Sequence, residues 1–111
     1  MGATNRAFQN VTKVIAISGT TSESVSIGDY GSGSVQLPAA LTGTTLTIQT
    51  SNDGTTWATC RDIAGAAKAA ITFAASITVP LHAEAFASKF LRLLSNGTEA
   101  AARSFIFHLK G

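Results

Sequence analysis

Few side chains in this chain of 111 residues are of types that could carry chemistry, and their spacing limits what they could do. His82 and His108 are the only histidines. Neither has a cysteine, a second histidine or a carboxylate at a spacing typical of a metal site, so the sequence predicts no metal ion and no other cofactor. We expect both to be ordinary surface or edge histidines.

The single cysteine and the few acidic residues also fail to form a catalytic set. Cys60 cannot form an intramolecular disulfide, has no neighbouring histidine that would mark a nucleophile, and is expected in the core. Asp62 and Glu84 could form a carboxylate pair, but such a pair needs a cleft that no pattern here indicates. Asp53 is explained as a turn residue. The sequence therefore predicts a protein that is not an enzyme.

Trp57 has two interpretations, because a tryptophan near the end of a β-sandwich can stack on a sugar or anchor the core. If Leu46 and Ile48 face inward, the strand that returns after a turn at residues 52–54 should bring Trp57 over the same layer. This geometry favours the core anchor. Tyr30 is the only tyrosine, so no strip of polar-tipped aromatic side chains is expected.

The chain is poor in charge for a globular domain. Charged residues make up 13% of it, against about 25% in an average protein, and the net charge is only +2. Such a surface has weak electrostatic protection against self-association, so we infer that a partner or further copies of the chain cover part of it. The basic residues are scattered, with no run that would follow a phosphate backbone, and nucleic-acid binding is not expected.

The sequence shows no targeting or membrane-spanning pattern. Its N-terminus leads into no apolar segment of the kind found in signal peptides, and no window approaches about 18 uninterrupted apolar residues. We therefore expect no membrane association, and folding in a reducing cytoplasm. A chain of this length forms one domain and can bury roughly 65% of its unfolded surface without metals or disulfides.

The clearest element is a β-hairpin over residues 46–62, and we expect the rest of the chain to pack against it. Leu46 and Ile48 alternate with polar residues, which is the period-two pattern of a strand with one buried face. Asn52-Asp53-Gly54 then supplies the glycine and the short polar side chains that a chain reversal favours. Trp57 opens the predicted return strand.

Shorter strand patterns flank the hairpin, separated by Gly, Pro, Asn and Ser. They cover residues 11–18, 25–30, 34–37, 71–73, 77–81, 89–95 and 103–110. The Gly-Ser-Gly segment at residues 31–33 should interrupt the sheet. The connection around Pro38 should cross between layers before the hairpin, and residues 82–88 are the best candidate for a short helical turn.

These patterns predict an all-β fold, an antiparallel β-sandwich or jelly roll of about eight short strands with one helical turn. The domain should span residues 11–111. Residues 1–10 lack periodicity and are expected to form a flexible N-terminal arm, whose Phe8 could dock on a partner.

Residues 37–57, which contain the turn before Trp57, and residues 90–95 with 100–105 resemble small β-sandwich virion proteins of tailed bacteriophages. Within that group, a free-standing domain of this size is most similar to capsid decoration, or cement, proteins. The resemblance implies a sandwich or jelly roll on the outside of the head that binds the major capsid protein. It also implies frequent trimers, a terminal arm that reaches neighbouring subunits, and no catalytic residues.

On this resemblance we expect a virion protein made in the bacterial cytoplasm, with Arg6, Phe8 and Lys13 as capsid contacts. A surface with few charges suits permanent contacts, and a polar arm that ends in Phe8 suits a docking strand. One alternative is a carbohydrate-binding sandwich on a virion, which would need Trp57 or Tyr30 exposed in a groove. Another is a different head or tail accessory protein.

Overall fold

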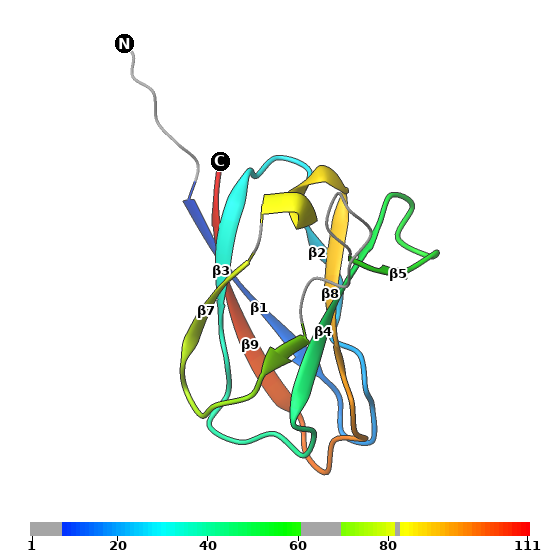
Figure 1. Ribbon diagram of the computed structural model, residues 1–111, viewed down its shortest axis with the longest axis vertical. Coiled ribbons are helices and arrows are strands. Elements are labelled where there is room, and N and C mark those ends of the chain that lie inside the picture. The colour runs from blue at the N-terminus through cyan, green and yellow to red at the C-terminus, as the bar shows by residue number, and fades with distance from the viewer. Residues whose placement is uncertain (1–7, 61–69, 82) are drawn as a thin grey trace.

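The computed structural model describes residues 8–60, 70–81 and 83–111. These residues form two antiparallel sheets that pack face to face, with one 3₁₀ turn, η1 (Ala83–Ala87), at the end where the first described strand begins and the last strand ends (Figure 1). The strands are β1 (Phe8–Ile15), β2 (Val25–Ser26), β3 (Ser32–Gln36), β4 (Thr45–Ser51), β5 (Ala58–Thr59), β6 (Ala70–Thr72), β7 (Thr78–Leu81), β8 (Phe90–Ser95) and β9 (Arg103–Lys110).

The strand order is that of a jelly roll. One sheet has the order β1-β9-β3-β7, and the other has the order β2-β8-β4-β5, with β6 also paired to β4. Strands from the two halves of the chain pair in a nested way, β1 with β9, β2 with β8, β3 with β7, and β4 with β5 and β6. All these pairs are antiparallel, so the predicted all-β sandwich or jelly roll is confirmed.

The hairpin predicted over residues 46–62 is present, although its two strands are unequal. β4 pairs with β5 only at Gln49 with Thr59 and at Thr50 with Ala58. β8 is the longer neighbour of β4, which therefore lies inside the sheet. The connection that contains Pro38 crosses from β3 in one sheet to β4 in the other, as predicted, and η1 lies within the predicted helical turn.

Two predicted boundaries are wrong. The first strand was expected over residues 11–18, but β1 begins at Phe8, so the last three residues of the expected arm pair with the end of β9. Residues 1–7 lie outside the described residues. The Gly-Ser-Gly segment does not interrupt the sheet, because Ser32 and Gly33 belong to β3.

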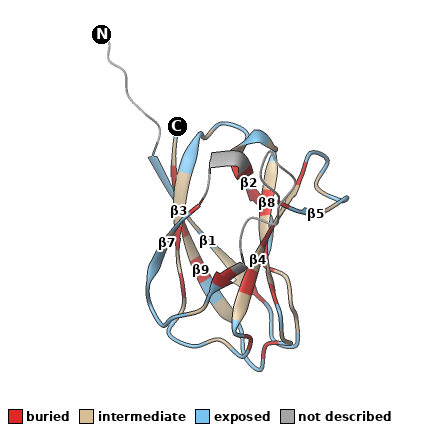
Figure 2. Ribbon diagram, viewed as in Figure 1, coloured by how far each residue is buried: buried red, intermediate tan, exposed pale blue. Residues whose placement is uncertain are grey.

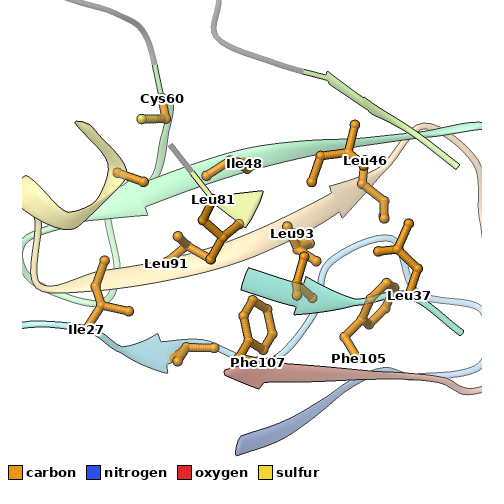
Figure 3. Packing of buried hydrophobic residues seen from close by; sticks show 14 of the residues in the cluster. Ile27, Leu37, Leu46, Ile48, Cys60, Leu81, Leu91, Leu93, Phe105 and Phe107 are labelled. Carbon is orange, nitrogen blue, oxygen red and sulfur yellow. The ribbon is translucent and has the colours of Figure 1, made fainter. Parts of the chain in front are cut away.

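The core lies between the sheets and follows the strand pleat (Figure 2). Phe105 and Phe107 of β9 are fully buried and lie across the core from Leu91 and Leu93 of β8 (Figure 3). β9 is the strand predicted over residues 103–110, and its odd-numbered positions 105–109 are buried while the residues between them are half-buried on the outer face. The outer faces of the two sheets are therefore the surfaces on which a site could form.

Gly33 is required by close packing between β3 and its neighbours. A Cβ added there would lie 2.7 Å from the carbonyl oxygen of His108 and 3.2 Å from the ring of Phe86. A Cβ at Gly31 would have no atom within 4 Å. The fold therefore requires a glycine at position 33 but has room for a side chain at position 31.

Gly33→Ala should lower the free energy of unfolding by about 1 to 3 kcal/mol, because the methyl group would overpack against backbone. Gly31→Ala is the matched control, whose methyl group enters open space, and its effect should stay within about 1 kcal/mol. Urea denaturation of both variants would measure the difference. Equal losses of stability would contradict the packing role of Gly33.

Candidate functional site

The residues considered for catalysis do not form a reactive cluster in the described part of the chain. His108 lies half-buried on the outer face of β9, and its Nδ1 is 2.7 Å from Oδ1 of Asn10 on β1. Cys60 is buried in the core, as predicted. No group of three or more His, Cys, Asp and Glu side chains among the described residues could hold a metal ion. His82, Asp62 and the side chain of Glu84 lie outside the description.

Asp53 organises the loop between β4 and β5, as predicted for a turn residue. Its Oδ1 accepts hydrogen bonds from the backbone N–H groups of Thr55 and Thr56, each at 2.8 Å, and from the hydroxyl of Ser51. These bonds, first of all that from Thr56, hold the pKa of Asp53 well below its usual value. The carboxylate is therefore explained by the turn.

Glu99 is the one fully buried charged side chain among the described residues, and the sequence analysis missed it. Its backbone exchanges hydrogen bonds with Ser18 and Gly19 after β1. Its carboxylate accepts hydrogen bonds from the backbone N–H of Thr42 (2.8 Å) and of Gly43 (3.1 Å), the hydroxyl of Ser95 (2.8 Å) and Nε of Arg103 (2.9 Å). The Glu99 side chain, in the loop between β8 and β9, thus joins the loop before β4 to the end of β8 and the start of β9.

The environment of Glu99 makes it a structural anchor. Burial alone would raise its pKa, but the four hydrogen bonds to its carboxylate outweigh burial and lower the pKa to about 2. No side-chain nitrogen or oxygen buried among the described residues lacks a hydrogen-bond partner. A carboxylate that is charged and fully bonded at neutral pH cannot readily take up a proton, so it is unsuited to acid–base chemistry.

Trp57 does not lie in the core, contrary to the favoured interpretation. It is half-buried on the outer face of the five-stranded sheet, where the guanidinium carbon of Arg92 lies 4.5 Å from the centroid of its ring. The strand pleat explains this position. Gln49 pairs with Arg92 on one side and with Thr59 on the other, opposite the inward face that carries Ile48. Trp57 precedes Thr59 by two residues and shares its face.

Arg92 is held in place at this surface by two contacts. Besides its position over Trp57, its Nε donates a hydrogen bond to Oε1 of Gln49 at 2.8 Å. Its terminal nitrogens have no hydrogen-bond partner and no carboxylate within 4.0 Å among the described residues. The result is an oriented cation beside an aromatic ring, with a bidentate edge that has no partner among the described residues.

Phe8, an expected contact residue, lies on the outer face of the other sheet and is 73% exposed. It borders a groove of about 430 Å³, here called the outer groove, and Nζ of Lys110 lies 5.8 Å from the centroid of its ring. The groove is lined mainly by Phe8, Asn10, Ser34, Pro80, His108 and Lys110. It is an open, weakly charged surface with one exposed aromatic side chain.

Lys13, the second expected contact residue, lies on the opposite face of β1 from Phe8. It pairs with Phe105, whose side chain points inward, and lines a separate groove of about 300 Å³ between the edges of the two sheets. Asp29 and Tyr30 line the same groove, and the Tyr30 hydroxyl donates a hydrogen bond to Gln9. The structure therefore does not bring Phe8 and Lys13 to one surface. Arg6 lies outside the described residues.

No protein-family model matches this sequence, and no curated protein or solved structure matches it. None of the described segments forms an apolar helix of the length needed to cross a bilayer. Two surfaces of the molecule are candidates for binding, the outer groove with Phe8 and the stack of Arg92 on Trp57.

Replacing the buried carboxylate should change how stability depends on pH. The pKa of Glu99 is about 2 in the folded chain against 4.5 ordinarily, so its stabilising effect is complete above pH 4.5 and is lost as the pH falls through 2. Glu99→Gln should therefore remove a pH-dependent stabilisation on the order of 3 kcal/mol.

Urea denaturation between pH 7 and pH 2 would measure this effect. The wild-type curve should converge toward that of Glu99→Gln as the pH falls. Asp29→Asn, which removes an exposed carboxylate, is the control and should leave the free energy of unfolding at pH 7 within about 0.5 kcal/mol of the wild-type value. A constant difference between the wild type and Glu99→Gln would contradict the role assigned to the charge.

Proposed function

We propose that this chain is a structural protein of a tailed-phage virion, which decorates the outer surface of the head by binding the major capsid protein. The observation that carries the proposal is Phe8, an aromatic side chain that is 73% exposed beside a weakly charged groove on a sheet face. An exposed aromatic side chain next to such a groove favours burial against a protein surface.

The energetics of this surface suit attachment in many copies. Covering the ring of Phe8 would contribute about 1.5 to 3 kcal/mol, a modest gain for one molecule. The groove offers few charges that would need to be desolvated, since Lys110 is the only Lys, Arg, Asp or Glu among its described lining residues. Repetition over a capsid would convert such modest contacts into strong overall attachment.

The fold supports the proposal without deciding it. Jelly rolls serve as viral capsid domains and as lectin domains, so the architecture alone favours both a virion role and glycan binding. Function has to be argued from the sites that the fold carries. Contact with several capsid subunits, which the resemblance implies, belongs to the same proposal.

Glycan binding on a virion is the second candidate, and the stack of Arg92 on Trp57 favours it. Trp57 lies outside the core on a sheet face, close to the neutral polar side chains of Gln49 and Thr59. The bidentate edge of Arg92 would pair with a carboxylate, so the ligand class would be a glycan that contains uronic acid.

Co-sedimentation with heads of the encoding phage, purified without this protein, would test the decoration proposal. Phe8→Ser should weaken binding at least about tenfold, because the buried ring is lost. Ile17→Ser is the matched control, since Ile17 is also a large exposed apolar side chain, at 64%, but lies beyond the far end of β1. Absence of wild-type binding, or equal losses in both variants, would overturn the proposal.

Titration with oligogalacturonate, followed by the fluorescence of Trp57, would test the second candidate. Arg92→Met should abolish the response while the domain stays folded, and a neutral oligosaccharide should give a much weaker response than the acidic one. Trp57→Ala should also leave the domain folded, at a cost below the roughly 3 to 5 kcal/mol of a buried tryptophan. Equal responses to the acidic and neutral sugars would exclude the assigned role of Arg92.

A further inference from the structure

The first half of β1 is a strand edge without a partner among the described residues. β1 lies at the end of the order β1-β9-β3-β7, and only its last residues are covered, where the N–H of Val14 donates to the Glu23 carboxylate and the carbonyl of Val14 accepts from the N–H of Glu23. Alternate residues of a strand direct their peptide groups to the same side. The N–H and C=O groups of Phe8, Asn10 and Thr12 therefore point away from β9, as those of Val14 do.

Side-chain contacts between β1 and β9 agree with the conclusion that the peptide groups of Phe8, Asn10 and Thr12 point away from β9. Peptide groups that point outward make Phe8–Lys110 and Asn10–His108 non-hydrogen-bonded pairs, in which facing side chains approach most closely. Asn10 does reach His108 at 2.7 Å, and the ammonium of Lys110 lies 5.8 Å from the Phe8 ring. No described segment pairs with the edge at Phe8, Asn10 or Thr12.

We propose that this edge pairs with the same edge of a second copy, antiparallel, about a two-fold axis at Asn10. Only even-numbered residues offer outward peptide groups, so they must pair with one another across the axis. Pairing Asn10 with Asn10 of the second copy and Phe8 with Thr12 uses every free group in this part of the edge. Moving the two-fold axis toward the C-terminal end of β1 would require the peptide group of Val14 to pair as well, and that group is already hydrogen-bonded to Glu23.

The chemistry of the edge favours a second copy over a charged partner. The three residues whose peptide groups would pair are uncharged, so no like charges meet in the register centred on Asn10. Lys13 lies three residues past the axis, which leaves the two lysines of a dimer about 20 Å apart along the strands. The exposed ring of Phe8 would lie beside the Thr12 side chain of the second copy, and part of its surface would be covered.

The pairing would join the two β1-containing sheets into one continuous sheet. Both outer grooves would then lie on the same face, so a partner of that face would meet two copies of each contact. An edge accepts one strand, which makes this contact a two-fold dimer and not the trimer implied by the resemblance. The inference goes beyond the proposed function and does not require capsid binding.

Charge placed at the paired positions tests the register. In light scattering over a range of concentrations, the wild-type mass should rise from 11.4 kDa toward twice that value. Asn10→Lys puts like charges on the axis and should weaken association at least tenfold. The double variant F8K/T12K should do the same, whereas F8K/T12E places opposite charges face to face and should retain the dimer.

Disulfide formation gives a second measurement at the axis. Facing residues of an antiparallel pair have Cα atoms about 5.5 Å apart at most, which a disulfide can span. Asn10→Cys should form a covalent dimer on mild oxidation, whereas Ser104→Cys, exposed on the outer face of β9, is the control and should not. Circular dichroism would verify that each variant is folded.

A wild-type mass that stays at one chain, or equal behaviour of the F8K/T12K and F8K/T12E variants, would overturn the proposal. So would cross-linking of Ser104→Cys as fast as Asn10→Cys. Failure of the dimer would leave the capsid proposal standing, because co-sedimentation of Phe8→Ser against Ile17→Ser reports on attachment to heads and not on chain mass.

Discussion

The buried carboxylate of Glu99 is the constraint on which one end of the jelly roll depends. Burying a charge is costly unless donors replace its water, and here the donors come from Thr42, Gly43, Ser95 and Arg103. Those residues lie where β4 and β9 begin and where β8 ends, and the Glu99 backbone adds the turn after β1. Segments from both sheets must therefore come together around one side chain, and loss of any one donor would leave part of the buried carboxylate without a hydrogen bond.

At the opposite end of the sandwich, the described residues include no second buried charge, and this end carries the exposed ring of Phe8 and the outer groove. β1 enters the sheet at Phe8 with an exposed ring and unpaired peptide groups, and β9 leaves it beside the outer groove. Rigid pairing of β1 with β9 nevertheless fixes where these groups point. A contact surface built on a paired strand loses little conformational freedom on binding, which makes weak, repeated contacts practical.

Local patterns predicted the fold because a jelly roll is made of short strands whose pleat is visible in the sequence, as in β9 with its buried odd-numbered residues. The local patterns failed where contacts between distant residues, or the shape of a loop, determine the position of a side chain.

Trp57 was predicted to face inward because the pattern of β4 does not show which residues of the strand after the loop face the core. The turn at Asp53 determines which face they take. Glu99 depends on donors far away in sequence, although a lone charge between Arg92 and Arg103 was a usable signal. The inward position of Lys13 could have been predicted, because Val11, Lys13 and Ile15 are every second residue of β1 and so share its inward face.

The two edges of the β1-containing sheet explain why self-pairing would stop at two copies. β7 forms the other edge of this sheet. Peptide groups alternate in direction along a strand, so the nitrogen of Pro80 points away from β3, where an added strand would need an N–H donor that proline lacks. On β1, Glu23 covers the end of the strand and Lys13 keeps a charge at the inward side of the edge, which opposes addition of a strand in other registers. A two-fold pair uses both free edges and leaves none to extend the sheet, so the same features that favour a dimer also prevent open-ended aggregation of a weakly charged chain.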